Sequence, residues 1–277
     1  MKTIKYITVF LAFLAMHGVL AQEGSIDLFS VPLSEPSKPG KLMVDQLTGS
    51  ISVEAYEGKE VVVKATLSSS EGCCGGKNKQ KDATKSKGMK RIGNSSLNIS
   101  AEEKNNVVQI VNEQWNRATN LEIKVPQNFS LKLSTVNEGD IWVKGVKGDM
   151  EVSNVNGAIT LESVSGSAST DTVNGDIDIT FEKITSNANM AFSSLNGDLN
   201  ISFPSSLKAD VKAKSEMGEI YTDFDLVVSS NKPEVSENSS SGTYKVKLEQ
   251  WVRGKINGGG PEMLFKTFNG NVYIKSN

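Results

Sequence analysis

The stretch VNGDIDI at residues 173–179 sets the pattern of this chain, because close copies of it return along the sequence. VNGAITL stands at 155–161 and LNGDLNI at 195–201, while VKGDMEV and FNGNVYI stand at 146–152 and 268–274. Each copy has an apolar residue, a small or polar residue and a glycine, then a polar residue or alanine, followed by two apolar residues two positions apart. A short unit that returns at nearly fixed intervals is typical of a stacked array of repeats.

The spacing of the glycines and of the apolar residues predicts short strands joined by corners. Five glycines lie nine residues apart, at Gly139, Gly148, Gly157, Gly166 and Gly175. Apolar residues two apart follow them, such as Ile177 and Ile179, and side chains two apart on a strand share one face. These side chains are therefore predicted to point inward.

The dipeptide Asn-Gly marks the corners, because glycine accepts the positive φ that a tight turn requires. In the copies of the repeat it begins at Asn156, Asn174, Asn196 and Asn269. A different corner lies about midway between successive Asn-Gly pairs, so two strands are predicted to make one turn of the coil. Stacked asparagines are expected either to form a hydrogen-bonded ladder or to act as separate turns.

These patterns predict an all-β, single-domain β-solenoid over residues 40–277, built of short stacked strands with Asn-Gly turns. Residues 22–39 contain three prolines between positions 31 and 40, which favours an extended lead-in over a central strand. The last copy of the repeat, with Val272 and Ile274, is expected to cap the array.

Residues 1–21 have the pattern of a secretory signal peptide. Two lysines near the start precede an apolar run that ends at Leu20, and cleavage is expected before Gln22. The run is short for a membrane span, and no other stretch approaches one. We therefore expect an exported chain in the periplasm, at the outer cell surface or secreted, with no transmembrane segment after cleavage.

The residues left after cleavage exclude several kinds of chemistry. The single histidine, His17, lies in the signal segment, so Ser-His-Asp and Cys-His catalysis and imidazole ligation of zinc or copper are excluded. The chain has 30 basic and 32 acidic residues, and cleavage removes Lys2 and Lys5 from the basic set. This balance argues against a nucleic-acid partner. No catalytic residue, metal or cofactor is predicted.

Residues 68–93 interrupt the repeat with Cys73, Cys74 and a run of lysines. The composition predicts a solvated loop inserted at an edge of the coil. An alternative is attraction to an anionic surface, which salt would weaken. In an oxidising compartment the two cysteines are candidates for a vicinal disulfide, for pairing with another chain or for reactive thiols.

Carboxylates follow several of the turn glycines, at Asp140, Asp149, Asp176, Asp198 and Glu219. A row of acids is able to bind calcium, and a suitably spaced pair is able to cleave glycosides. However, calcium-binding nonapeptide repeats carry a second glycine where this chain has an apolar residue. Aspartate beside a turn glycine is ordinary turn chemistry, which is the interpretation we favour.

The outward residues of the strands on the side of the coil that has the Asn-Gly corners form the candidate binding face. They are Trp142, Thr160, Asp178, Asn200 and Tyr221, with Tyr273 on the last copy. If the strands stack in register, these residues line up in a stripe with aromatic rings at its ends. Such a stripe suits sugar rings or a partner protein, although surface aromatics also pack under loops.

Several motifs together resemble a known family. They are PGKL at 39–42 with GSISV at 49–53, the Asn-Gly turns between 137 and 201, MGEI at 217–220, and GGGP at 258–261 with TFNGNVYI at 267–274. The chain resembles the bacterial β-solenoids called putative adhesins or Toastrack proteins, and is similar to their exported Bacteroidetes-type members. The resemblance implies a β-solenoid of unknown function and supplies no catalytic or ligand residues.

Three functions remain open from the sequence. The leading hypothesis is an exported, non-enzymatic module that presents a flat β-face to an envelope protein or a surface glycan. The alternative is a carbohydrate-active β-helix enzyme that uses Asp176, Asp178 or Asp198. The third is a structural or envelope-sensing module without a ligand.

Overall fold

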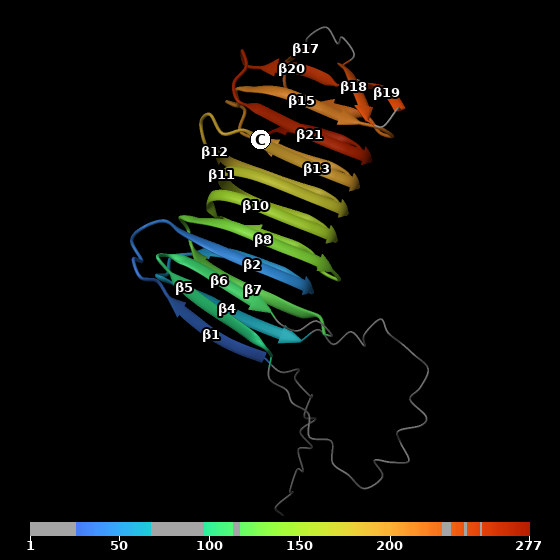
Figure 1. The fold of residues 1–277 in the computed structure, drawn as a ribbon. Coiled ribbons are helices and arrows are strands. Elements are labelled where there is room, and N and C mark those ends of the chain that lie inside the picture. Colours follow the sequence, from blue (N-terminus) through green and yellow to red (C-terminus); the bar gives the residue numbers. More distant parts are fainter. Residues whose placement is uncertain (1–25, 68–96, 113–116, 229–233, 241–242, 250) are drawn as a thin grey trace, which may run out of the picture.

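The computed structural model describes residues 26–67, 97–112, 117–228, 234–240, 243–249 and 251–277. The predicted signal peptide, the whole of the predicted loop at 68–93 with its two cysteines, and Trp115 lie outside these ranges. Within them the chain is all-β, without a helix. Its strands stack as the rungs of a long column (Figure 1). The predicted all-β, solenoid-like class is therefore confirmed.

One side of the column is formed by the strands that we call sheet I. In spatial order it contains β5 (Ile99–Lys104), β6 (Val107–Asn112), β2 (Gly40–Thr48), β8 (Phe129–Asn137), β10 (Lys147–Asn156), the second half of β11 (Ile159–Asn174), β13 (Met190–Asn196), β21 (Glu262–Asn269), β15 (Ala209–Ser215), β20 (Val252–Ile256) and β17 (Leu226–Val228). Strands β6 to β15 pair in parallel, whereas β5, β20 and β17 add antiparallel strands at the two ends.

The other side is formed by sheet II. In spatial order it contains β1 (Ile26–Pro32), β4 (Glu60–Leu67), β7 (Thr119–Pro126), β3 (Ile51–Tyr56), β9 (Ile141–Lys144), the first half of β11, β12 (Ile177–Ile184), β14 (Leu199–Phe203), β22 (Val272–Ser276) and β16 (Ile220–Thr222). Strands β18 (Glu234–Ser240) and β19 (Thr243–Glu249) form a separate hairpin.

The register of the parallel pairs gives the period of the coil. Ile141 pairs with Ile159 and Ile159 pairs with Ile177, so equivalent residues are 18 apart. Ile177 pairs with Leu199, where the longer loop after β12 raises the interval to 22. One strand of sheet I and one of sheet II therefore complete each turn, as the spacing of the corners predicts.

The chain does not end at the end of the column. Strands β21 and β22 lie between the coil of β13 and β14 and the coil of β15 and β16, and Figure 1 shows β21 between β13 and β15. The prediction that Val272 and Ile274 cap the array is therefore wrong. Both side chains are fully buried. This burial fits a coil that is covered by one neighbouring coil on each side.

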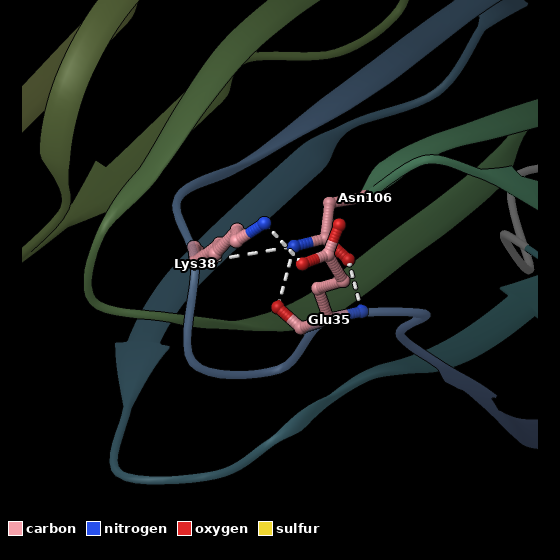
Figure 2. A network of polar contacts seen from close by, with 3 residues as sticks. All are labelled: Glu35, Lys38 and Asn106. Atoms are coloured by element: carbon pink, nitrogen blue, oxygen red, sulfur yellow. Dashed lines mark hydrogen bonds and ion pairs between the residues drawn. The ribbon is translucent and has the colours of Figure 1, made fainter.

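A fixed loop follows β1 in the predicted lead-in. Strand β1 itself pairs antiparallel with β4 at the edge of sheet II. Asn106, at φ 60° in the β5–β6 turn, accepts the Glu35 N–H (2.8 Å) and donates to the carbonyl oxygens of Glu35 (2.6 Å) and Lys38 (3.4 Å) (Figure 2). An ion pair joins Lys38 to Glu35. This network holds residues 33–39 against the first coils.

The inward side chains form one continuous core between the two sheets. The apolar residues predicted to point inward, such as Ile141, Leu161 and Ile177, are fully buried. Toward the C-terminal half, four phenylalanines take the place of aliphatic residues: Phe181, Phe192, Phe203 and Phe265. Each new coil therefore gains its stability from apolar area that it shares with the coils above and below it.

Of the two alternatives that the sequence allows for the corner asparagines, separate turns or a hydrogen-bonded ladder, the structure shows the ladder. Asn156 Nδ2 donates to Asn137 Oδ1 (3.1 Å), Asn174 Nδ2 to Asn156 Oδ1 (2.8 Å) and Asn196 Nδ2 to Asn174 Oδ1 (2.8 Å). The side chains are exposed, so the ladder contributes alignment of the coils rather than a large part of the stability.

A second, buried ladder runs beside the asparagines, and the sequence analysis missed it. Two residues before each corner asparagine or its equivalent, a polar side chain donates to a carbonyl of the turn below. These donors include Thr135, Asn154, Thr172, Ser194, Thr267 and Ser215. The recurring Ser, Thr or Asn at that position is the sequence signal from which the ladder could have been predicted. The hydrogen bonds matter because burying one of these polar groups without a partner would cost about 1–3 kcal/mol.

Candidate functional site

The predicted binding residues form one column on the outer surface of sheet II, which we call the stripe. Cross-strand pairing places Trp142 beside Thr160, Thr160 beside Asp178, and Asp178 beside Asn200. Tyr273 follows Asn200, and Tyr221 follows Tyr273. The structure thus brings all six residues into register, with Tyr273 between Asn200 and Tyr221.

Trp142 begins the stripe and has a fixed ring. Its indole Nε1–H donates to Glu162 Oε1 (3.0 Å), and Lys144 Nζ lies 3.5 Å from the other carboxylate oxygen of Glu162. Lys144 Nζ also lies 5.7 Å from the indole centroid. Because the N–H group is already bonded within the protein, Trp142 contributes an aromatic surface rather than a donor.

Tyr273 and Tyr221 form the other end of the stripe. Their rings stack with centroids 5.1 Å apart and planes at 9°. The Tyr221 hydroxyl donates to Glu219 (2.5 Å), and this hydrogen bond raises the pKa of Tyr221 above its ordinary value. Lys275 Nζ lies 5.3 Å from the Tyr273 ring. The pair presents an aromatic surface two strands wide, in which Tyr221 is about half exposed.

Three polar side chains connect the aromatic ends. Thr160 and Asn200 are partly exposed and Asp178 is exposed. Among the described residues, none of the three side chains has a hydrogen-bond partner within the protein. Their hydroxyl, carboxylate and amide groups therefore face solvent and are able to bond a ligand.

A hollow of about 370 Å³ adjoins the stripe beyond Trp142, and the sequence analysis did not anticipate it. Its lining includes Ser52, Glu54, Val62, Lys64, Glu122 and Lys124, with the exposed Leu28 at one side. Ser52 is the cross-strand neighbour of Trp142, so the hollow continues the column of the stripe. The pairing of residues 51–54 with 141–144 has no local sequence signal, which is why the hollow was missed.

Three of the turn carboxylates, in contrast, accept hydrogen bonds from the backbone. Asp140 Oδ1 accepts the Ala158 N–H (2.8 Å), Asp176 Oδ1 accepts the Asp198 N–H (2.8 Å), and Asp198 Oδ1 accepts the Asn271 N–H (2.7 Å). In each case the acceptor lies in one coil and the donor in the next. Turn chemistry thus accounts for these three aspartates. Asp149 and Glu219 instead accept side-chain hydroxyl groups, from Ser167 (2.6 Å) and Tyr221 (2.5 Å).

Replacement of Asp198 is expected to show this structural role. Alanine removes the acceptor of the Asn271 N–H and should lower the free energy of unfolding by about 1 kcal/mol. Asparagine keeps an acceptor oxygen at the same place and should cost less than half of that. Urea unfolding followed by far-UV circular dichroism measures both variants. An asparagine variant as unstable as the alanine variant would show that the charge, not the hydrogen bond, matters.

In the described ranges, no three His, Cys, Asp or Glu side chains cluster as metal ligands would. Nor does any helix in that part of the chain have the length and apolarity to cross a membrane. Cys73 and Cys74, the predicted disulfide or reactive thiols, lie outside the described residues.

The fold defines an all-β, solenoid-like protein, and comparison with known proteins finds a family model similar to its central part. Residues 127–251, which include the central coils, match the model of the Toastrack DUF4097 family. The resemblance inferred from the sequence motifs is therefore confirmed. None of the curated proteins matches the chain.

Two solved structures are similar to this chain. The first is a putative cell adhesion protein from Clostridium sporogenes, with 14% identity, a TM-score of 0.44 and alignment over 91% of this chain and 99% of that one. The second is a putative adhesin from Bacteroides fragilis, with 10% identity, a TM-score of 0.37 and alignment over 91% and 97%. At these TM-scores, neither likeness bears on the ligand of this chain.

Proposed function

We propose that this chain is an exported, non-enzymatic recognition module that binds an extended ligand of the cell envelope on the stripe. The observation that carries the proposal is the register of the stripe, with aromatic surfaces at its two ends and, between them, three polar side chains that have no partner among the described residues. Aromatic surfaces with a few convergent polar groups are typical of binding sites. The signal-peptide pattern of residues 1–21 supports export.

The turn carboxylates favour this proposal over the enzymatic alternative. Asp176 and Asp198 each use a carboxylate oxygen to hold the backbone of the next coil. Asp178 lies in the stripe beside Asn200. Cleavage of a glycoside requires a second acid at a suitable distance, whereas binding a ligand does not.

The test compares capture of envelope components by the mature chain and by two variants. Trp142→Ala combined with Tyr221→Ala removes the ring at one end of the stripe and one of the two stacked rings at the other. Phe268→Ala is the matched control, because it removes an exposed ring (51% exposed) from a corner of the coil outside the stripe. We expect wild type and Phe268→Ala to retain the same envelope component and the double variant to lose it, with unchanged far-UV circular dichroism. Equal capture by all three proteins, or capture by none, would overturn the proposal.

A further inference from the structure

Resting on the proposed function, we propose that the ligand of the stripe is an uncharged linear polysaccharide that lies across the strands, along the axis of the coil. One sugar ring packs on Trp142 at the rim of the hollow, and another packs on the Tyr273–Tyr221 pair. The sugars between them bond to Thr160, Asp178 and Asn200. Three features of the surface support this ligand class.

The first feature is the shape of the stripe. It is one side chain wide, and four strand spacings separate Trp142 from Tyr273, or about 19 Å at 4.7–4.9 Å per spacing. A stable protein interface needs about 800 Å² per partner with a compact apolar centre, and a stripe of polar residues between distant rings does not provide one. A narrow, long track fits a linear chain of rings.

The second feature is the charge of the surface around the hollow and Trp142. Lys64 Nζ pairs with Glu122 (3.0 Å), and Lys144 pairs with Glu162 (3.5 Å). Glu54 lies in register between Lys124 and Lys144 on the neighbouring strands. Because positive and negative groups alternate across this surface, it offers neither a basic track for a polyanion nor an acidic track for a basic peptide. An uncharged ligand matches it.

The third feature is the pattern of hydrogen-bonding groups. Thr160 both donates and accepts, Asp178 accepts, and Asn200 does both through separate atoms. Within the described residues these side chains have no partner in the protein, so each has full capacity for ligand hydroxyl groups. The hollow beside Trp142, at about 370 Å³, falls within the range of small-ligand sites and has polar groups such as Ser52 and Glu54 in its lining.

The geometry makes the length of the oligosaccharide the decisive variable. A ligand of one or two sugars reaches only one aromatic end, whereas a ligand that spans about 19 Å reaches both. Linking two contacts in one molecule raises affinity strongly once the span is reached and only slightly thereafter. Affinity should therefore rise steeply with length and then level off.

The experiment is calorimetric titration of the mature chain with neutral linear gluco-, manno- and xylo-oligosaccharides of two to eight sugars, chosen by a screen on a glycan array. We expect at least one series to bind with the length dependence described above. Trp142→Ala should weaken the longest member by about tenfold and remove the dependence on length, and Tyr221→Ala should weaken it less, because Tyr273 remains. Phe268→Ala should bind as wild type does.

Envelope capture then separates failure of this inference from failure of the proposed function. The captured component is treated with periodate, which destroys sugars, or with a protease. Loss of capture after periodate treatment but not after protease treatment supports a polysaccharide ligand. Loss on protease alone, with capture still dependent on Trp142 and Tyr221, overturns the polysaccharide and keeps the recognition module. Length-independent binding, binding of polyanions only, or binding unaffected by Trp142→Ala also overturns the inference.

Discussion

Replacement of Gly175 by alanine is expected to lower the free energy of unfolding by about 3 kcal/mol or more, because the glycines of successive corners stack directly on one another. A Cβ at Gly175 would lie 2.1 Å from the carbonyl oxygen of Gly157 and 2.5 Å from its carbonyl carbon. These are backbone atoms of the coil below, so no side-chain rotation relieves the clash. The same contact recurs at Gly197, whose Cβ would lie 2.0 Å from the Gly175 oxygen.

The matched control for this variant is Gly145→Ala. Gly145 has φ of 69°, in the left-handed region, but the nearest atom to its Cβ would be Ala55 Cβ at 3.6 Å. Alanine there should lower the free energy of unfolding by only about 1–2 kcal/mol, which is the cost of the left-handed backbone conformation for a residue with a Cβ. Gly175 does not have a positive φ, so the two variants separate steric contact from backbone strain. Urea unfolding measures both, and a Gly175→Ala cost no greater than that of Gly145→Ala would refute the stacked-glycine explanation.

The stacked glycines of the corners also bear on function, because they set the distance along the axis of the coil between successive residues of the stripe. Asp178 follows Gly175 by three residues, and Asn200 follows Gly197 by three. Because the backbones approach closely at the corners, the strands of adjacent coils lie at the distance of paired β-strands. The side chains of the stripe are therefore separated by that same distance. A distorted corner is therefore expected to displace the ligand-binding side chains as well as to destabilise the coil.

Local periodicity was sufficient to predict the central coils. Apolar residues two apart after each glycine specify which side chains point inward, and this places Trp142, Thr160, Asp178 and Asn200 outward by elimination. The intervals of 18 residues between Trp142, Thr160 and Asp178, and of 22 residues between Asp178 and Asn200, then bring them into one column. The stripe could be predicted because each of its central members belongs to the next repeat along the chain.

Contacts between distant segments could not be predicted in this way. The order of Tyr273 and Tyr221 depends on insertion of β22 between β14 and β16, and no local pattern distinguishes an inserted coil from a terminal one. The hollow depends on the pairing of β3 with β9 and of β7 with β3 and β4. Long-range register of this kind follows from which surfaces bury most area in three dimensions, and a one-dimensional repeat does not contain it.

The interior of the C-terminal coils depends on a cluster of aromatic rings that links the two sheets. Phe192 of β13 in sheet I stacks on Phe265 of β21, with ring centroids 5.2 Å apart, and meets Phe203 and Phe181 of sheet II edge-to-face at 6.2 and 6.4 Å. Phe203 and Phe181 in turn stack at 5.2 Å. Their strands, β14 and β12, also carry Asn200 and Asp178, so the cluster supports the middle of the stripe from inside.

Phe192→Ala is therefore expected to lower the free energy of unfolding by about 4 kcal/mol, because it removes a fully buried ring and leaves a cavity between the sheets. Phe192→Leu keeps much of the volume and should cost less than half as much. The matched surface variant, Phe268→Ala, should change stability by no more than about 0.5 kcal/mol. Thermal and urea unfolding measure all three. A loss for Phe192→Ala similar to that for Phe268→Ala would mean that the four rings do not hold the two sheets together, and that the backbone ladders at the corners carry the stability of this half of the column.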